Sequence, residues 1–295
     1  MGIGEQERGV DKVTEIPCEG SSNAVEIDLE IAPPLPEIAW SILKVTTDLK
    51  TGVVQLEAII RRDQALTSEL LRIANSEYFG LVRKVDSLRH ASEILGSRRL
   101  RTLAVTVSLG GVMQKSAFGE SLWEHSLGVA HASAAIADET GYSDREKAFL
   151  AGMLHDIGKS ALNNQYPELF IESLQLAQRK RIHSIEAERL VLGIDHCQVG
   201  AKLADHWNLP ETLEEVVELH HEPLSASEDW KLVSIVNLAD GLCLKMGLGG
   251  RLDMSCDLRK LESWRSLEVK EAQIYRVSEK VASALERDKR FLGLV

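Results

Sequence analysis

Apolar residues recur at helical spacing along most of the chain from about residue 36 onwards. In the segment 36–45, Ile38, Ile42 and Val45 stand four and three residues apart, which places them on one helix face. Segments with the same period lie at 64–75, 88–95, 98–109, 121–140, 144–157, 184–192, 196–207, 210–221, 232–243 and 269–285. No Asn-Gly or Asp-Gly pair lies between two alternating, strand-like segments. The pattern predicts an all-α, multi-helix protein.

Residues at the ends of these segments are typical of helix caps. Asp63 and Asp195 each come directly before a helical segment, so we expect both to act as N-caps. The stretch 102–109 is rich in β-branched residues and could form a strand, but the segments around it favour a buried helix. It ends at Gly110–Gly111, which we expect to separate two lobes.

The segments divide the chain into three parts. Residues 1–28 have no sustained apolar period and are expected to form a flexible N-terminal tail. Residues 29–243 are expected to form one domain, in which an N-terminal helical lobe (29–111) packs on a second helical lobe (112–243). A C-terminal helical extension is expected at 244–295.

Composition narrows the class of protein. The 295 residues are 44% hydrophobic and 27% charged, which is ordinary for a globular protein, and the formal net charge is −11. An acidic chain is a poor match for broad, non-specific nucleic-acid binding, which needs a basic surface. The N-terminus has no apolar signal core, and no uninterrupted apolar run of about 18 residues is present, so we expect a cytoplasmic location and no membrane insertion.

The four cysteines show no C-x-x-C spacing. In a cytoplasmic chain they are expected to be reduced and structural. Cys197 also adjoins His196, which leaves a role as a metal ligand open.

The most informative chemical feature is the dipeptide His155–Asp156 within the apolar helical run 149–159. An imidazole and a carboxylate are costly to bury among apolar side chains unless a partner satisfies them, and a divalent cation would do so. Adjacent helical residues point about 100° apart, so both can reach one ion or Asp156 can bridge two. The full candidate ligand set is His125, His155, Asp156, His196, His220, His221 and Asp240.

Nitrogen and carboxylate ligands without an obligatory thiolate suit Fe, Mn, Zn, Ni or Co better than Ca. The alternative is that each histidine is simply satisfied within a helical core. His131 is six residues after His125 and should face elsewhere, while His90, His183 and His206 have polar surroundings and are expected at the surface.

The order of these residues resembles the HD superfamily, and the HDOD (HD-related output domain) branch most closely. The resemblance covers roughly residues 29–243 and rests on PLPEIA (34–39), RDQALTSELLRIANSEYFG (62–80), ASEILGSRRLR (91–101), LAGMLHDIGK (150–159), DHCQVGAKLADHWNLP (195–210) and LHHEP (219–223). It implies an HD-type helical fold for the second lobe.

The resemblance also implies roles for individual residues. Positions matching the basic metal set of HD phosphohydrolases are His125, His155, Asp156 and Asp240, and those matching the extra ligands of HD-GYP phosphodiesterases are His196, His220 and His221. Lys159 matches a phosphate-approaching lysine, so Asp156 and Lys159 would be the catalytic pair if the protein is an enzyme. After His221 the chain reads EPLSASEDW in place of the D-G-x-G-Y-P segment of HD-GYP enzymes, which argues against cyclic-di-GMP hydrolysis.

Three functions are consistent with these features. HDOD proteins are generally regarded as regulators, so the first is a bacterial signal-transduction protein with a divalent-metal site, of one ion or two, that acts through protein partners. The second is a metal-dependent phosphohydrolase acting on a nucleotide or cyclic dinucleotide. The third is nucleic-acid binding through the basic turn 96–101, for which a solvated helix start is the competing explanation in so acidic a chain.

Overall fold

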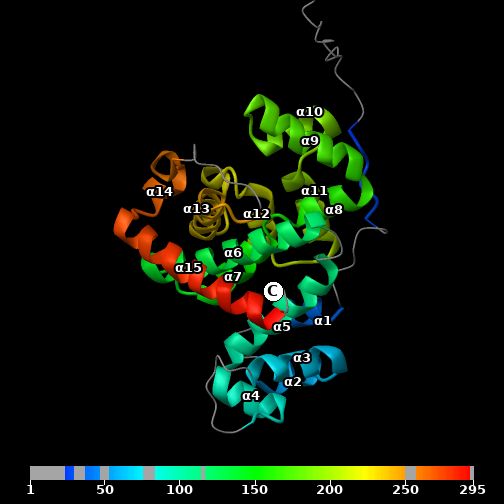
Figure 1. Ribbon diagram of the computed structural model, residues 1–295, viewed down its shortest axis with the longest axis vertical. Coiled ribbons are helices and arrows are strands. Elements are labelled where there is room, and N and C mark those ends of the chain that lie inside the picture. The colour runs from blue at the N-terminus through cyan, green and yellow to red at the C-terminus, as the bar shows by residue number, and fades with distance from the viewer. Residues whose placement is uncertain are drawn as a thin grey trace, which may run out of the picture.

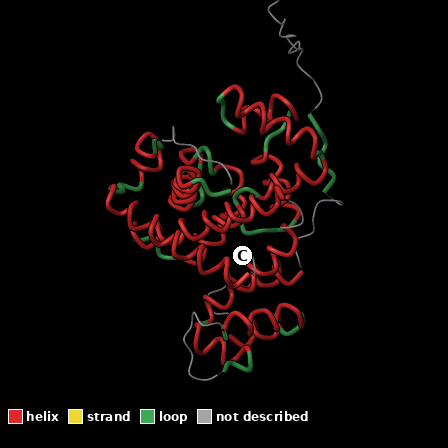
Figure 2. Tube along the Cα trace, in the orientation of Figure 1, coloured by secondary structure: helices red, strands yellow, loops and turns green. Residues whose placement is uncertain are grey.

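The computed structural model describes residues 24–29, 37–46, 53–75, 84–113, 117–249 and 257–292, and every regular element in these ranges is a helix (Figures 1 and 2). The α-helices are α1 (Glu37–Thr46), α2 (Val53–Ile60), α3 (Gln64–Ala74), α4 (Leu88–Leu95), α5 (Ser97–Met113), α6 (Ala117–Thr140), α7 (Arg145–Leu154), α8 (Ile157–Gln165), α9 (Pro167–Lys180), α10 (Ser184–Leu192), α11 (His196–His206), α12 (Glu211–Leu219), α13 (Trp230–Met246), α14 (Glu262–Ser266) and α15 (Glu271–Leu292). Two single 3₁₀ turns are η2 (Pro223–Ser225) and η3 (Leu258–Lys260). The predicted all-α class is confirmed.

Helices α1 to α5 form the N-terminal lobe, in which α1, α3 and α4 pack against α5. The expected N-cap is present, since the Asp63 side chain accepts a hydrogen bond from the Leu66 backbone N–H at 2.9 Å. The predicted helix end at Gly110–Gly111 is wrong, because α5 continues through both glycines to Met113. A Cβ on Gly110 would lie 3.1 Å from the Trp123 ring, so the glycine serves close packing against α6.

The second lobe is organised around the 24-residue helix α6, which contacts α7, α13 and α15. Helix α15 runs along the same side of the lobe as α6 and α7 (Figure 1). It buries Val277 and Val281, while Asp288 holds the His131 ring at 2.6 Å. His131 therefore faces α15, which agrees with the prediction that it does not face the same way as His125.

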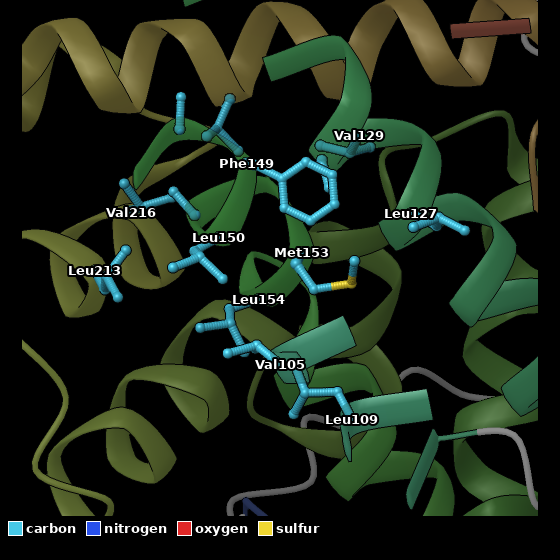
Figure 3. Packing of buried hydrophobic residues seen from close by; sticks show 14 of the residues in the cluster. Val105, Leu109, Leu127, Val129, Phe149, Leu150, Met153, Leu154, Leu213 and Val216 are labelled. Atoms are coloured by element: carbon cyan, nitrogen blue, oxygen red, sulfur yellow. The ribbon is translucent and has the colours of Figure 1, made fainter. Parts of the chain in front are cut away.

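Helix α7 lies between the two lobes and is buried from Ala148 to Leu154. Figure 3 shows Val105 and Leu109 of α5 close to Leu154 of α7 within one apolar cluster. The cluster continues towards Leu213 and Val216 of α12 (Figure 3). The chain that follows Leu154 is thus held by apolar packing from both lobes.

Residues 24–28, which the sequence assigns to the tail, lie along α8 to α10. The Val25 backbone N–H donates to the Leu192 carbonyl at 2.9 Å, and the Tyr166 hydroxyl donates to the Glu26 carbonyl at 2.7 Å. Ile27 is buried in the core. The ordered fold therefore includes residues upstream of the predicted start at 29. None of the described helices combines the length and the apolar character needed to cross a bilayer.

Candidate metal centre

His155 and Asp156 occupy the turn between two helices, which differs from the uninterrupted helix that the sequence predicts. Helix α7 ends at Leu154 and α8 begins at Ile157. The Asp156 backbone, with φ −100° and ψ 16°, has left the helical region. At this junction both side chains turn inwards, and both are fully buried.

Asp156 stands at the N-cap position of α8, but its carboxylate makes no capping hydrogen bond in the described structure. Its two oxygens face two pairs of histidines instead. Oδ1 lies 3.3 Å from His196 Nε2 and 3.7 Å from His220 Nε2. Oδ2 lies 3.3 Å from His155 Nε2 and 3.7 Å from His125 Nε2. The carboxylate is therefore placed between two groups of nitrogen donors.

The remaining candidate ligands complete these groups. Asp240 of α13 places Oδ1 3.1 Å from Nε2 of His125, which comes from α6. His221 follows His220 at the end of α12, and their ring centroids are 4.1 Å apart. All seven predicted residues converge in one place, and only His221 is partly exposed among them.

Backbone carbonyls set the orientation of two of the rings. His155 Nδ1 donates to the Gly152 carbonyl at 2.8 Å, and His220 Nδ1 donates to the Val217 carbonyl at 3.1 Å. A carbonyl only accepts, so each Nδ1 carries a proton and each Nε2 is the nitrogen left to face the centre of the cluster.

Several buried atoms of this cluster have no hydrogen-bond partner among the described residues: Nε2 of His155, His196, His220 and His221, and Oδ1 of Asp156. Metal–nitrogen bonds of about 2.0–2.1 Å allow two ligands of one ion to be at most about 4.2 Å apart. The separations of 3.1 to 3.7 Å fall inside that limit. The residues present therefore fit a divalent transition metal.

Cys197 lies beside the cluster. Its Sγ is 4.0 Å from Nδ1 of His220, the nitrogen that is already bonded to the backbone. Burial raises the pKa of the Cys197 thiol, which disfavours the thiolate that would bind a metal. The nitrogen and carboxylate set remains the stronger candidate.

Burial and neighbouring charges shift the pKa values of several groups in and beside the cluster. Burial alone would raise the pKa of Asp240, but the hydrogen bond and charge of His125 outweigh it and hold that pKa well below the usual range. Burial lowers the pKa of His220 to about 3, so its ring is neutral. Burial alone would lower the pKa of Lys159, but the carboxylate of Asp156, 2.6 Å from Nζ, outweighs it and raises that pKa.

A small pocket of about 90 Å³ opens onto the cluster. Its polar lining includes His125, Asp156, Lys159 and Asp240. His183 also lines it, with its ring centroid 4.6 Å from that of His221. The sequence predicts His183 at the surface, and it is exposed, but its contact with His221 was not foreseen.

Sequence reasoning also missed Glu188 of α10, which is fully buried. Its Oε2 accepts hydrogen bonds from His196 Nδ1 at 2.7 Å and from the His196 backbone N–H at 2.8 Å. Glu186 and Glu188 both lie in this helix, and the local pattern does not show which one turns inwards.

Comparisons with known proteins agree with this fold. A model of the HDOD domain matches residues 32–223. A Geobacter sulfurreducens structure, described as an HDOD domain protein with unknown function, gives a TM-score of 0.76 at 27% identity, covering 90% of this chain and 93% of that one. An uncharacterized protein of Treponema pallidum is 27% identical over 212 residues, which make up 70% of this chain and 41% of that protein.

Ribonuclease Y of Mycoplasma mycoides is 30% identical over 134 residues, which make up 45% of this chain and 25% of that protein. The chain thus spans less than half the length of these two curated relatives. The HDOD model, in contrast, covers well over half of the chain and includes the turn that carries His155 and Asp156. The resemblance noted in the sequence is confirmed, and the chain belongs to the HDOD domain family.

Proposed function

We propose that this protein binds a divalent transition metal (Fe, Mn, Zn, Ni or Co) in the His/Asp cluster and acts as a regulatory protein in bacterial signal transduction through protein partners. The observation that carries the metal proposal is the position of Asp156 between two histidine pairs, with one oxygen facing each pair. A bridging carboxylate of this kind accommodates two ions.

Two features of the site support a regulatory role. The ligands come from α6, α11 and α13 and from the residues that follow α7 and α12, so two ions that share Asp156 would tie five parts of the lobe together. Ion binding would thereby stabilise one arrangement of helices that a partner can recognise. The pocket of about 90 Å³ over Asp156 is also well below the roughly 300–1,000 Å³ that is usual for small-molecule sites, and a wider pocket of about 570 Å³ touches only His221 among the candidate ligands.

Elemental analysis of the purified protein tests the metal proposal. Wild type should carry a transition metal, and His155→Ala combined with Asp156→Ala should not. His131→Ala is the matched control, because His131 lies on α6 like His125 but bonds to Asp288. A chelator should lower the melting temperature of wild type and of the control, and should leave the double variant unchanged. Metal retained by the double variant would show that the site is assigned wrongly.

A second candidate function is metal-dependent phosphohydrolysis. The observation that favours it is the pocket, whose lining includes both Asp156 and Lys159. A divalent metal, when bound, would supply Lewis-acid activation of water. Asp156 would orient that water, and the Lys159 ammonium would stabilise negative charge developing on a phosphate. The similarity of a 134-residue segment to ribonuclease Y adds support for a phosphodiester substrate.

A turnover screen over phosphoesters, nucleotides and cyclic dinucleotides distinguishes the two functions. We expect weak or no hydrolysis of cyclic-di-GMP, because the small pocket and the EPLSASEDW segment both differ from what such a substrate needs. Robust hydrolysis by the metal-loaded protein that disappears in His220→Ala would instead establish the enzyme.

A further inference from the structure

Glu188 is the buried acidic residue of α10 that contacts a candidate metal ligand without belonging to the ligand set. Its exposed fraction is 0%, and its Oε2 accepts both the Nδ1 proton and the backbone N–H of His196. Its other oxygen, Oε1, has no hydrogen-bond partner in the described part of the chain. A carboxylate in this state is costly to bury, so its presence calls for a physical explanation.

The contact differs from those of the neighbouring rings. His155 and His220 direct Nδ1 at backbone carbonyls, which are neutral acceptors. His196 directs Nδ1 at a carboxylate, which carries a full charge. A carboxylate draws the Nδ1 proton more strongly and makes Nε2 a better electron donor.

The geometry also shows that Glu188 does not bind the ion itself. The two nitrogens of an imidazole ring point to opposite sides of the ring. Glu188 is on the Nδ1 side of His196, while Asp156 Oδ1 lies 3.3 Å from Nε2 on the other side. Glu188 therefore contacts the ligand cluster through the His196 ring and not as a ligand.

We propose that Glu188 is a positioning residue, which fixes the orientation and tautomer of His196 and strengthens its Nε2 as a ligand on the Asp156 Oδ1 side of the cluster. The inference rests on the proposed metal site and adds to it a residue outside the ligand set. The backbone bond makes the arrangement rigid, because the same oxygen holds both the ring and the first N–H of α11.

The test compares Glu188→Gln with wild type for zinc affinity, measured by competition with a chromophoric chelator. The glutamine keeps the size of the side chain and removes its charge. We expect zinc binding to weaken about 10- to 100-fold, the effect usual for losing such a partner of a ligand histidine. Glu215→Gln is the control: Glu215 is also buried and accepts backbone N–H bonds, but it contacts loop 227–229 and no ligand ring.

A second measurement separates positioning from a purely structural role. Nitrogen NMR of zinc-loaded wild type should show His196 with Nδ1 protonated and Nε2 bound to the metal. The opposite tautomer would overturn the proposal, and this measurement needs no variant to fold. Equal zinc affinity of wild type and Glu188→Gln, with only a lower melting temperature in chelator, would also overturn it. If wild type itself binds no zinc or other transition metal, the metal proposal fails first, which is a distinct result.

Discussion

Gly158 offers a direct test of how closely the fold controls the metal site. It is the second residue of α8, and α8 packs against α11, whose first residue is His196. A Cβ at position 158 would lie 1.9 Å from the His196 carbonyl oxygen and 2.7 Å from the Gly200 backbone nitrogen. Both contacts are with backbone, which cannot rotate away. We therefore expect Gly158→Ala to disrupt both stability and metal binding.

The magnitude follows from these distances. An ordinary Cβ contact begins at 3.4 Å, so the two backbones must separate by about 1.5 Å at this point. Metal sites tolerate ligand displacements of only about 0.2 Å. Overpacking costs about 1–3 kcal/mol, or more against backbone, and the better helix propensity of alanine returns about 1 kcal/mol. Because the contacts here are with backbone, the cost should reach the upper end of that range, and the net loss of about 2 kcal/mol corresponds to a melting temperature lower by about 4–8 °C.

The assay is thermal unfolding with and without chelator, together with metal content. Gly128→Ala is the matched control, because its Cβ would lie 2.6 Å from Cδ1 of Leu248, the end of a flexible side chain. Gly128 is also close to a ligand, three residues after His125 on α6. The control should keep its metal and most of its stability. The reasoning is refuted if Gly158→Ala melts within 1 °C of wild type and retains a full complement of metal.

Two further predictions concern charged residues outside the metal site. Burial alone would raise the pKa of Glu215, but hydrogen bonds from backbone N–H groups of loop 227–229 outweigh burial and lower that pKa. The contribution of Glu215 to stability is therefore fully present above about pH 4.3, the pKa in the unfolded chain, and is lost as the pH falls through the lower pKa of the folded protein. Glu215→Gln should lower the free energy of unfolding by about 1–3 kcal/mol at neutral pH and by less in acid. Urea unfolding at pH 3 to 7 measures this, and a difference from wild type that stays the same at every pH would contradict it. Reversal of the exposed pair Arg98 and Arg99 to glutamate should leave metal content and stability unchanged. Reversal of half-buried Arg101, which interacts with the carboxylates of Asp144 and Glu146 at the start of α7, should destabilise the fold. Salt-sensitive retention of DNA or RNA by wild type, lost on reversing these arginines, would instead support nucleic-acid binding.

The sequence was sufficient for the fold class, because helical periodicity is visible over segments that lie far apart in the chain. It also selected the residues that converge on Asp156, since the unusual order of histidines and aspartates along the chain can be recognised without the structure. It misplaced the His155–Asp156 turn, because the apolar run from Phe149 to Ile157 continues across the junction and conceals it.

The other departures depend on contacts between distant segments. Gly110 lies inside a helix, where the nearby ring of Trp123 favours a residue without a Cβ, and no local signal in the sequence reports that contact. Glu188 and His183 acquire their neighbours, His196 and His221, only when α10 folds against α11 and the end of α12. Hydrophobic periodicity shows which residues share a face of one helix. It does not show which residues of a second helix that face will contact.

The short segment at 24–29 has a practical consequence for anyone who shortens this chain. The family match begins at residue 32, which makes that position a natural place to start a truncated protein. Such a cut would remove the segment beside α10, which lies so close that a Cβ on Gly193, at the end of that helix, would be 2.6 Å from the Ala24 Cα. It would also leave the Leu192 carbonyl without its donor from Val25. In a protein that begins at residue 32, the helix that carries Glu188 would then be less firmly held. If that protein lost its metal, the loss would be mistaken for a property of the full-length chain.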